Sequence, residues 1–179
     1  MNDLGYFWPS NPSELRRFLQ IDIRANKRDP KALTVLILFR LCQFAMGDRW
    51  KPRLLSFPLI ALYRILTEFI LGMEMRPKTS VGPGLQIFHG FGLVINDHCD
   101  IGAGVVLRNG VTIGNRSDGG AVPKLEDGVE IGCGAIILGD IVVGRNAKVG
   151  AGSVVLSSVE PDQTVVGNPA RPILPRARQ

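Results

Sequence analysis

The chain has few of the residues on which disulfide frameworks and histidine chemistry depend. Its 179 residues include two histidines, His89 and His98, and three cysteines, Cys42, Cys99 and Cys133. An odd number of cysteines at unrelated spacings argues against a disulfide framework and favours a reducing, cytoplasmic setting. The first residues also lack the charged-then-apolar order of a signal peptide.

No apolar run is long enough for a confident membrane span, although 45% of the residues are hydrophobic. The most apolar segment, residues 54–72, is interrupted by Pro58, Arg64 and Glu68. The formal net charge of +5 suggests an anionic partner, yet no nucleic-acid module or aromatic-studded basic stripe is present. We therefore expect an anionic cofactor or a membrane surface rather than nucleic acid.

Residues 13–72 predict helices, with a cap at Ser13, an interruption at Pro30 and ends at Gly47 and Gly72. We expect these helices to pack on the rest of the protein or on a neighbouring subunit. The alternative is shallow attachment to a membrane face, with apolar residues toward lipid and basic residues near the headgroups. The basic residues in that alternative are Arg40, Arg49, Lys51 and Arg53.

Residues 79–156 follow a repeat of six. Aliphatic residues recur at every sixth position, often before glycine, and the run from Leu125 to Val155 covers six consecutive repeats. Neither the helical nor the simple strand period gives a strict six. The repeat predicts short flat strands joined by tight turns, with one aliphatic side chain per strand stacking inward. We expect a helical region over 1–73, a β-helix over 74–160 and a tail over 161–179.

Two breaks in this repeat mark a candidate site. The step from Ile87 to Ile95 is eight residues and contains His89, and the step from Ile113 to Leu125 is twelve. The second break holds the polar, glycine-rich stretch "GNRSDGGAVPK" and predicts an external loop over 115–124. Because functional loops gather on the outside of solenoids, we expect both breaks to belong to one working region.

The repeat, the loop and the motifs "FHGFG", "GMEMRP" and "GNPARPI" resemble the hexapeptide-repeat acyltransferases with a left-handed parallel β-helix. The resemblance is closest to the serine acetyltransferase branch, and within it to the acetyltransferases of colanic acid and other exopolysaccharide biosynthesis. It implies that His89 is the general base that takes the proton of the acceptor hydroxyl, and that Glu74 is the carboxylate that orients this histidine. Direct transfer in a ternary complex is expected, because no serine or cysteine motif suggests a covalent intermediate.

The resemblance also implies an acceptor pocket. Asp22 corresponds to an aspartate that approaches the amino group of serine, Phe88 stands in place of an acidic residue, and Val122 stands where serine acetyltransferases have a second histidine. The absence of the acid at Phe88 and of the histidine at Val122 removes polar partners for a charged amino acid and favours a neutral, partly apolar acceptor such as a sugar face. We expect O-acetylation of a sugar hydroxyl in exopolysaccharide or capsule biosynthesis. Serine O-acetyltransferase and a non-catalytic β-helix scaffold are the alternatives.

Acetyl-CoA is the implied co-substrate, bound along a groove between adjacent β-helices of a homotrimer. Its pantetheine arm would contact backbone groups of the coils, and its phosphates would need cations near the C-terminal end. The candidates are Gly114, Asn115, Ala135, Lys148, Ala151 and Arg171, with Arg176 and Arg178 as either phosphate ligands or a solvated tail. Gly114 and Asn115 are also the candidates for the backbone donor to the thioester oxygen.

The remaining polar turn, Asp97 to Asp100, is expected to be structural. His98 lies within an undisturbed repeat and reads as a turn residue that faces water. Contiguous residues on a tight turn offer no standard ligand spacing, so no metal site is expected. Cys99 and Cys133 occupy small-residue positions of the repeat and are expected to be packing residues.

Overall fold

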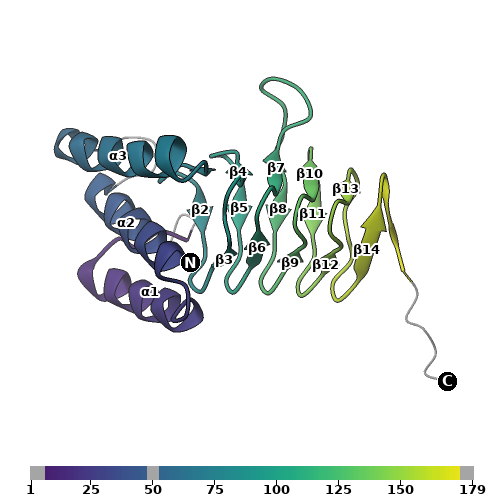
Figure 1. Ribbon diagram of the computed structural model, residues 1–179, viewed down its shortest axis with the longest axis horizontal. Helices are drawn as coiled ribbons and strands as arrows, with labels where there is room; N and C mark the ends of the chain where they lie inside the picture. The colour runs from purple at the N-terminus through teal and green to yellow at the C-terminus, as the bar shows by residue number, and fades with distance from the viewer. Residues whose placement is uncertain (1–6, 48–52, 174–179) are drawn as a thin grey trace.

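The computed structural model describes residues 7–47 and 53–173. Helices come first, and the chain then winds through three parallel sheets in turn to form a β-helix of five turns (Figure 1). This arrangement confirms the fold class that the six-residue repeat predicts. The helical elements are α1 (Pro12–Ala25), α2 (Pro30–Met46), the 3-10 turn η1 (Leu54–Ser56), α3 (Phe57–Arg64) and its π-helical continuation η2 (Ile65–Ile70).

The prism has three faces, here called sheets A, B and C. Sheet A contains β1 (Glu74–Met75), β4 (Val94–Ile95), β7 (Thr112–Gly114), β10 (Ile136–Leu138) and β13 (Val154–Val155). Sheet B contains β2 (Ser80–Val81), β5 (Asp100–Ile101), β8 (Lys124–Leu125) and β11 (Val142–Val143). Sheet C contains β3 (Gln86–Phe88), β6 (Val106–Arg108), β9 (Glu130–Ile131), β12 (Lys148–Val149), β14 (Thr164–Gly167) and β15 (Ala170–Pro172).

The aliphatic residues of the repeat form the core of the prism. In sheet A, each strand contributes one inward side chain, and none of these is more than 2% exposed. They are Met75, Ile95, Ile113, Ile137 and Val155. Each such burial favours folding by about 1.5–3 kcal/mol relative to an exposed side chain. The stacked columns therefore explain why the six-residue spacing is kept so strictly between Leu125 and Val155.

The ends of the predicted segments differ from the sequence-based boundaries. The N-cap of α1 is Asn11 rather than Ser13, because Asn11 Oδ1 accepts a hydrogen bond from the N–H of Glu14 at 2.9 Å. At the other end, residues 161–173 are not a tail. β14 continues sheet C by parallel pairing with β12, and β15 turns back antiparallel to β14. This hairpin ends the sheet, because an antiparallel strand cannot continue the winding of the coil.

The N-terminal helices close the open end of the prism. The first coil has no preceding coil to bond with, and buried side chains of α1 and α2 satisfy its backbone groups instead. Arg40 donates to the carbonyls of Val81 at 2.7 Å and Gly82 at 2.8 Å, and Asp22 accepts from the N–H of Gly84 at 2.6 Å. Because a solenoid needs a cap on its end coil, the helical region is a structural part of the β-helix.

This cap shows that α1 and α2 pack on the β-helix, as the first of the two predictions for the helices has it. Arg40 is 0% exposed, so its predicted position near lipid headgroups is wrong. Two further basic residues of that alternative, Arg49 and Lys51, lie outside the described residues. Among the residues that are described, no helix is both long and apolar enough to cross a membrane. Packing of α1 and α2 on the β-helix is the arrangement that the structure has.

The outer side of η1, α3 and η2 stays uncovered in the single chain. Tyr63 and Thr67 face the core at 1% exposure, whereas the opposite side carries large apolar residues that are 52–93% exposed. We call this set the α3 stripe: Leu54, Leu55, Phe57, Leu62, Ile65, Phe69 and Ile70. In Figure 1, α2 lies between α1 and α3, so α3 has only one packed side.

Candidate functional site

The two breaks in the repeat lie at different corners of the prism. The segment with His89 joins β3 of sheet C to β4 of sheet A, and the loop over 115–123 joins β7 of sheet A to β8 of sheet B. The loop stands out from the prism beyond β7 (Figure 1). We call these places the C–A corner and the A–B corner. Since sheet A separates them, the single working region that the sequence predicts is not formed within one chain.

His89 lies in a strained turn at the C–A corner. Its φ is +66°, one of three positive values among the non-glycine residues that the structure describes. Its carbonyl accepts hydrogen bonds from the N–H of Phe91 at 2.6 Å and from Lys31 Nζ at 2.9 Å. A non-glycine residue in the left-handed region costs free energy and is most often kept where it serves a function. Lys31, from the first turn of α2, connects the helical cap to this turn.

Two glycines make the turn sterically feasible. A Cβ atom on Gly90, where φ is +55°, would approach Met73 Sδ to 2.8 Å. A Cβ atom on Gly72 would approach the ring of Phe91 to 2.9 Å. A side chain at either position would have to displace Met73 or Phe91, and it would be strained by the positive φ of the backbone. The "HGFG" sequence at residues 89–92 thus encodes the exposed position of the histidine.

A column of glycine turns continues along the C–A corner from His89. Gly92, Gly110, Gly134 and Gly152 all have φ between +65° and +70°. Each of the last three donates its N–H to a carbonyl of the turn in the preceding coil, at 2.8–2.9 Å. Nothing lies within 4 Å of the place where a Cβ of Gly134 or Gly152 would stand. The corner is therefore a smooth, backbone-lined edge.

Three of the predicted cofactor residues lie on this corner. Ala135 and Ala151 belong to its turns, with Ala151 exposed and Ala135 fully buried. Arg171, on β15, pairs with Val166 at the end of β14 that adjoins the same corner. From β3 to β14 there are four strand steps, which amount to about 19 Å at the usual strand spacing. His89 and Arg171 therefore lie toward opposite ends of this edge.

The other cofactor candidates lie elsewhere. Lys148 begins β12 at the far edge of sheet C and forms an ion pair with Glu130 at 2.8 Å. Gly114 and Asn115 lie at the A–B corner, where Asn115 Oδ1 accepts a hydrogen bond from Asn96 Nδ2 at 3.3 Å. These residues do not meet His89 within one chain. Arg176 and Arg178 lie outside the described residues.

Glu74 does not contact His89 in this structure. Its carboxylate lies 3.1 Å from Arg76 Nη2, and no hydrogen bond joins it to His89 in the described part of the chain. Glu74 instead lines a shallow hollow of about 240 Å³ on the outer face of sheet A, together with Gly114 and Asn115. The predicted carboxylate and the predicted oxyanion donors therefore share one hollow, from which the histidine is absent.

The three predicted acceptor residues have very different surroundings. Asp22 is 1% exposed and forms an ion pair with Arg40 at 2.9 Å. With Gly84 N–H on its other oxygen, Asp22 serves the cap, and this geometry does not favour the predicted substrate contact. Phe88 is 38% exposed beside His89, whereas Val122 packs partly buried against the core.

The turn with His98 is more ordered than the sequence suggests. His98 is 57% exposed, as expected of a turn residue, but its Nδ1 lies 2.8 Å from Asp97 Oδ1. Burial alone would raise the pKa of Asp97, but the hydrogen bond and charge of Lys78, with His98 and Arg76, outweigh it and lower this pKa below its usual value. Asp97 therefore stays ionised and anchors the turn.

The two repeat cysteines have different environments. Cys99 is buried, as predicted for a packing residue, whereas Cys133 is exposed and the packing prediction for it is wrong. Cys133 and Gly134 form a turn at the C–A corner. The missing signal was the glycine on each side of Cys133, which indicates a turn rather than a packed position.

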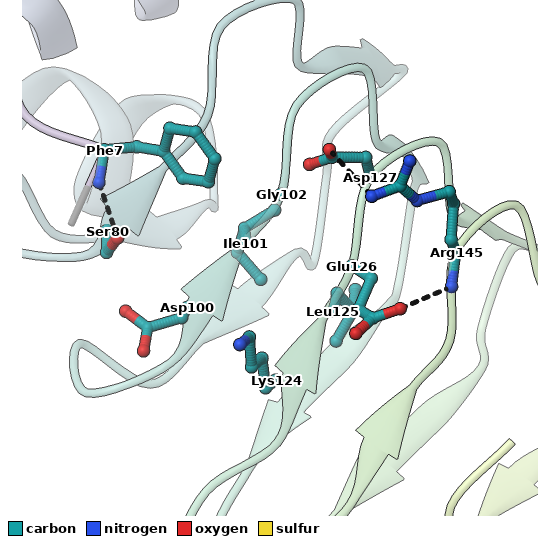
Figure 2. A pocket seen from close by; sticks show the side chains of 10 residues that line it. All are labelled: Phe7, Ser80, Asp100, Ile101, Gly102, Lys124, Leu125, Glu126, Asp127 and Arg145. Atoms are coloured by element: carbon teal, nitrogen blue, oxygen red, sulfur yellow. Dashed lines mark hydrogen bonds and ion pairs between the residues drawn. The ribbon is translucent and has the colours of Figure 1, made fainter. Parts of the chain in front are cut away.

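A second hollow, of about 250 Å³, lies on sheet B (Figure 2). Its walls include charged residues of both signs, among them Lys124, Glu126 and Arg145, and the N–H of Phe7 donates to Ser80 Oγ at its edge at 3.3 Å. No residue that the sequence singles out as a site residue lines it. Its Arg145 forms an ion pair with Asp127, with Nη2 and Oδ2 4.0 Å apart, and the backbone N–H of Arg145 donates to Glu126 at 2.9 Å.

Comparisons with known proteins agree with this architecture. Residues 123–157 match the family described as "Bacterial transferase hexapeptide (six repeats)". The chain is 42% identical over 154 residues to the putative colanic acid biosynthesis acetyltransferase WcaB of Escherichia coli K12, covering 84% of this chain and 95% of that one. It is 35% identical to the serine acetyltransferase of Helicobacter pylori, covering 97% and 98%. A solved serine acetyltransferase in complex with CoA superimposes with a TM-score of 0.75 at 31% identity, covering 92% of this chain and 71% of that one.

Proposed function

Since the chain belongs to the hexapeptide-repeat transferase family, on the branch of the serine and colanic acid acetyltransferases, we propose that it acetylates a sugar hydroxyl of an exopolysaccharide, capsule or lipid-linked precursor. The coarser statement follows from the family: the protein is an acetyltransferase with acetyl-CoA as its co-substrate. The identity of the acceptor is the part that we propose. The observation that carries it is an exposed histidine in a strained turn with an aromatic residue, rather than an acid, beside it.

His89 is the proposed general base. An alcohol attacks a thioester slowly, so a base that removes the proton as the bond forms contributes roughly two to four orders of magnitude in rate. The hydroxyl oxygen forms a bond to the acetyl carbon as its proton passes to His89, and the C–S bond breaks. Protonated His89 then returns the proton to the departing thiolate, so that CoA leaves as the thiol and the histidine is neutral again. The exposed position of His89 leaves room for both substrates. Glu74 would act as its orienting carboxylate only after leaving Arg76.

The C–A corner is the proposed binding site for acetyl-CoA. Its glycine turns keep side chains away, so an extended chain can lie against backbone groups. Ala151 has the small exposed side chain that such contact needs, and Arg171 offers a guanidinium for the phosphates. Lys148 would have to exchange its ion pair with Glu130 for one with a phosphate, so we propose that it contributes less to phosphate binding than Arg171.

A homotrimer would reconcile the two corners of the prism. Gly114, Asn115 and the external loop lie at the A–B corner, and His89 lies at the C–A corner of the same chain. If the A–B corner of one subunit packs beside the C–A corner of the next, the loop reaches a neighbour's histidine and closes the groove. We propose this arrangement. A sedimentation-equilibrium mass equal to that of the 19.5 kDa monomer would exclude it.

The identity of the acceptor can be tested by measuring turnover of acetyl-CoA with candidate acceptors. We expect release of the CoA thiol from acetyl-CoA in the presence of a saccharide from a panel of nucleotide sugars and oligosaccharides, and little release with serine. Serine O-acetylation is the second candidate, because the serine acetyltransferase of Helicobacter pylori matches 97% of the chain. Rapid turnover of serine without turnover of any saccharide would replace our proposal with this candidate.

A non-catalytic scaffold is the remaining alternative from the sequence, and the acetyltransferase relatives argue against it. It predicts that His89→Ala leaves the exopolysaccharide of the producing cell unchanged. An enzyme predicts that the same substitution removes the acetyl groups. Analysis of the acetyl content of the polysaccharide distinguishes the two.

We propose that the protein works in the cytoplasm and that the α3 stripe rests on the inner face of the membrane. The support is its set of large, exposed apolar side chains, with Leu55 at 93% and Phe69 at 81% exposure, and the polymer precursors that would be presented there. Co-sedimentation with anionic vesicles should fall for Leu55→Asp. Burial of the stripe on a neighbouring subunit is the competing arrangement, and for it the substitution would change the oligomeric mass instead.

A further inference from the structure

Phe91 is an exposed aromatic residue two positions after the proposed base. Its side chain is 70% exposed, although a phenyl ring in water is unfavourable by about 1.5–3 kcal/mol relative to a buried one. It lies outside the hydrophobic core, which contains neighbouring Leu93 at 0% exposure. Its position two residues after the proposed base, with Phe88 on the other side of His89 at 38% exposure, makes this ring a candidate for contact with the acceptor.

The backbone of Phe91 is held at both ends. Its N–H donates to the carbonyl of His89 at 2.6 Å, and its carbonyl accepts from the N–H of Gly110 at 2.8 Å. The ring lies over Gly72, where a Cβ would come within 2.9 Å of it. The ring and the imidazole therefore leave the same hydrogen-bonded turn, two residues apart.

Phe88, on the other side of His89, has a different arrangement. Its ring is 38% exposed, and the guanidinium of Arg108 lies 5.0 Å from the ring centre. One face of Phe88 is therefore already occupied by a cation. Phe91 has no such partner among the described cation–aromatic contacts, so its ring is the open one beside the base.

We propose that the ring of Phe91 is the stacking platform for the sugar ring of the acceptor, holding the reacting hydroxyl against His89; this inference rests on the proposed function. The C–H bonds on one face of a pyranose form an apolar patch, and aromatic rings bind such patches by contact and by the charge distribution of their faces. The Arg108 guanidinium, fixed over Phe88, supplies donors for sugar hydroxyls at the rim. Serine has no ring face and would gain little from this platform.

The proposal predicts that the ring, and not merely its apolar volume, matters. Phe91→Leu keeps an apolar side chain and removes the ring, whereas Phe91→Tyr keeps the ring. With the panel saccharide that the wild-type enzyme acetylates fastest, Phe91→Leu should raise the acceptor KM about 3- to 10-fold, and Phe91→Tyr should stay within about 2-fold of wild type. The KM for acetyl-CoA should not change. Phe57→Leu, an exposed aromatic of the α3 stripe at 52%, is the matched control and should leave both constants unchanged.

A second readout needs no catalysis. Titration of Phe91→Trp with the same saccharide should change its tryptophan fluorescence, whereas wild-type protein should show no such change. Equal acceptor KM values for Phe91→Leu and wild type would overturn the platform while leaving the proposed function intact. A changed oligomeric mass of Phe91→Leu would overturn it too, by assigning the ring to a subunit interface. Wild-type protein that acetylates serine and no saccharide would overturn both proposals.

Discussion

The buried ion pair between Asp22 and Arg40 offers the sharpest test of what the structure adds to the resemblance. The resemblance implies that Asp22 contacts the acceptor, whereas the structure has it 1% exposed and 2.9 Å from Arg40 Nε. Burial lowers the pKa of Arg40 below its usual value, and the neighbouring charge of Asp22 opposes this effect. Asp22→Asn removes that charge and leaves the guanidinium buried among carbonyl groups.

The magnitude follows from the contacts. Breaking a buried ion pair by removing one partner costs about 3–5 kcal/mol. Asparagine keeps an acceptor for the N–H of Gly84, so we take the lower limit, about 3 kcal/mol. For a chain of 179 residues, this corresponds to a fall in Tm of about 6–12 °C. The KM for the acceptor, measured well below the new Tm, should stay unchanged.

Asp29→Asn is the matched control for this experiment. Asp29 caps α2 by accepting a hydrogen bond from the N–H of Ala32 at 3.0 Å, and asparagine caps a helix as well as aspartate does. The control should therefore lose less than about 0.5 kcal/mol. Circular dichroism melting and thiol-release kinetics on the variants measure both quantities. A normal Tm for Asp22→Asn together with a raised acceptor KM would refute the structural argument and restore the substrate contact.

Three further outcomes are expected. His89→Ala should lower kcat by about 10²- to 10⁴-fold. His98→Ala, which loses an exposed pair with Asp97, should keep its activity and lose less than about 1 kcal/mol. Similar losses of activity in both variants would contradict the assignment. Native protein should react with iodoacetamide at Cys133 and not at Cys42, because burial raises the pKa of the Cys42 thiol to about 12. Acetyl-CoA should protect Cys133 from the reagent if it binds along the C–A corner. Mass spectrometry of the labelled peptides measures the reaction at each cysteine with and without acetyl-CoA. The lowered pKa of Asp97 stabilises the folded protein fully above the unfolded-state pKa of about 3.9, and this stabilisation is lost as the pH falls through the lower folded-state pKa. Asp97→Asn should therefore be less stable than wild type at pH 7 and equally stable in strong acid. Denaturant titrations at both pH values measure the difference.

The sequence was most informative where one residue type has one physical reason to be present. A strict repeat of six has no interpretation as a helix or an ordinary strand, and the inward residues that it marks, such as Ile113 and Ile137, are fully buried columns. A break in such a repeat must leave the coil. His89 was therefore identified as a candidate by counting, and the left-handed backbone at that position agrees with a special role.

The sequence was least informative about charged residues. Asp22 and Arg40 are eighteen positions apart, and nothing in the spacing shows that they pair inside the cap. The same holds for Glu74, whose separation from His89 fits the resemblance while its carboxylate contacts Arg76. A charge can find its partner on any element that the fold brings near, so its role depends on distances that the sequence does not contain.

By itself, then, the sequence determined the β-helix, the order of its coils and the two places where the coil is interrupted, because burial of one aliphatic residue in six leaves no other regular arrangement. Only the tertiary structure decided that these two places lie at opposite edges of sheet A, that the N-terminal helices cap the first coil through Arg40, and that Phe91 is exposed beside His89. The physical reason is that a repeat fixes which side chains point inward, whereas the corners, the caps and the outward side chains depend on contacts between residues that are far apart in the chain.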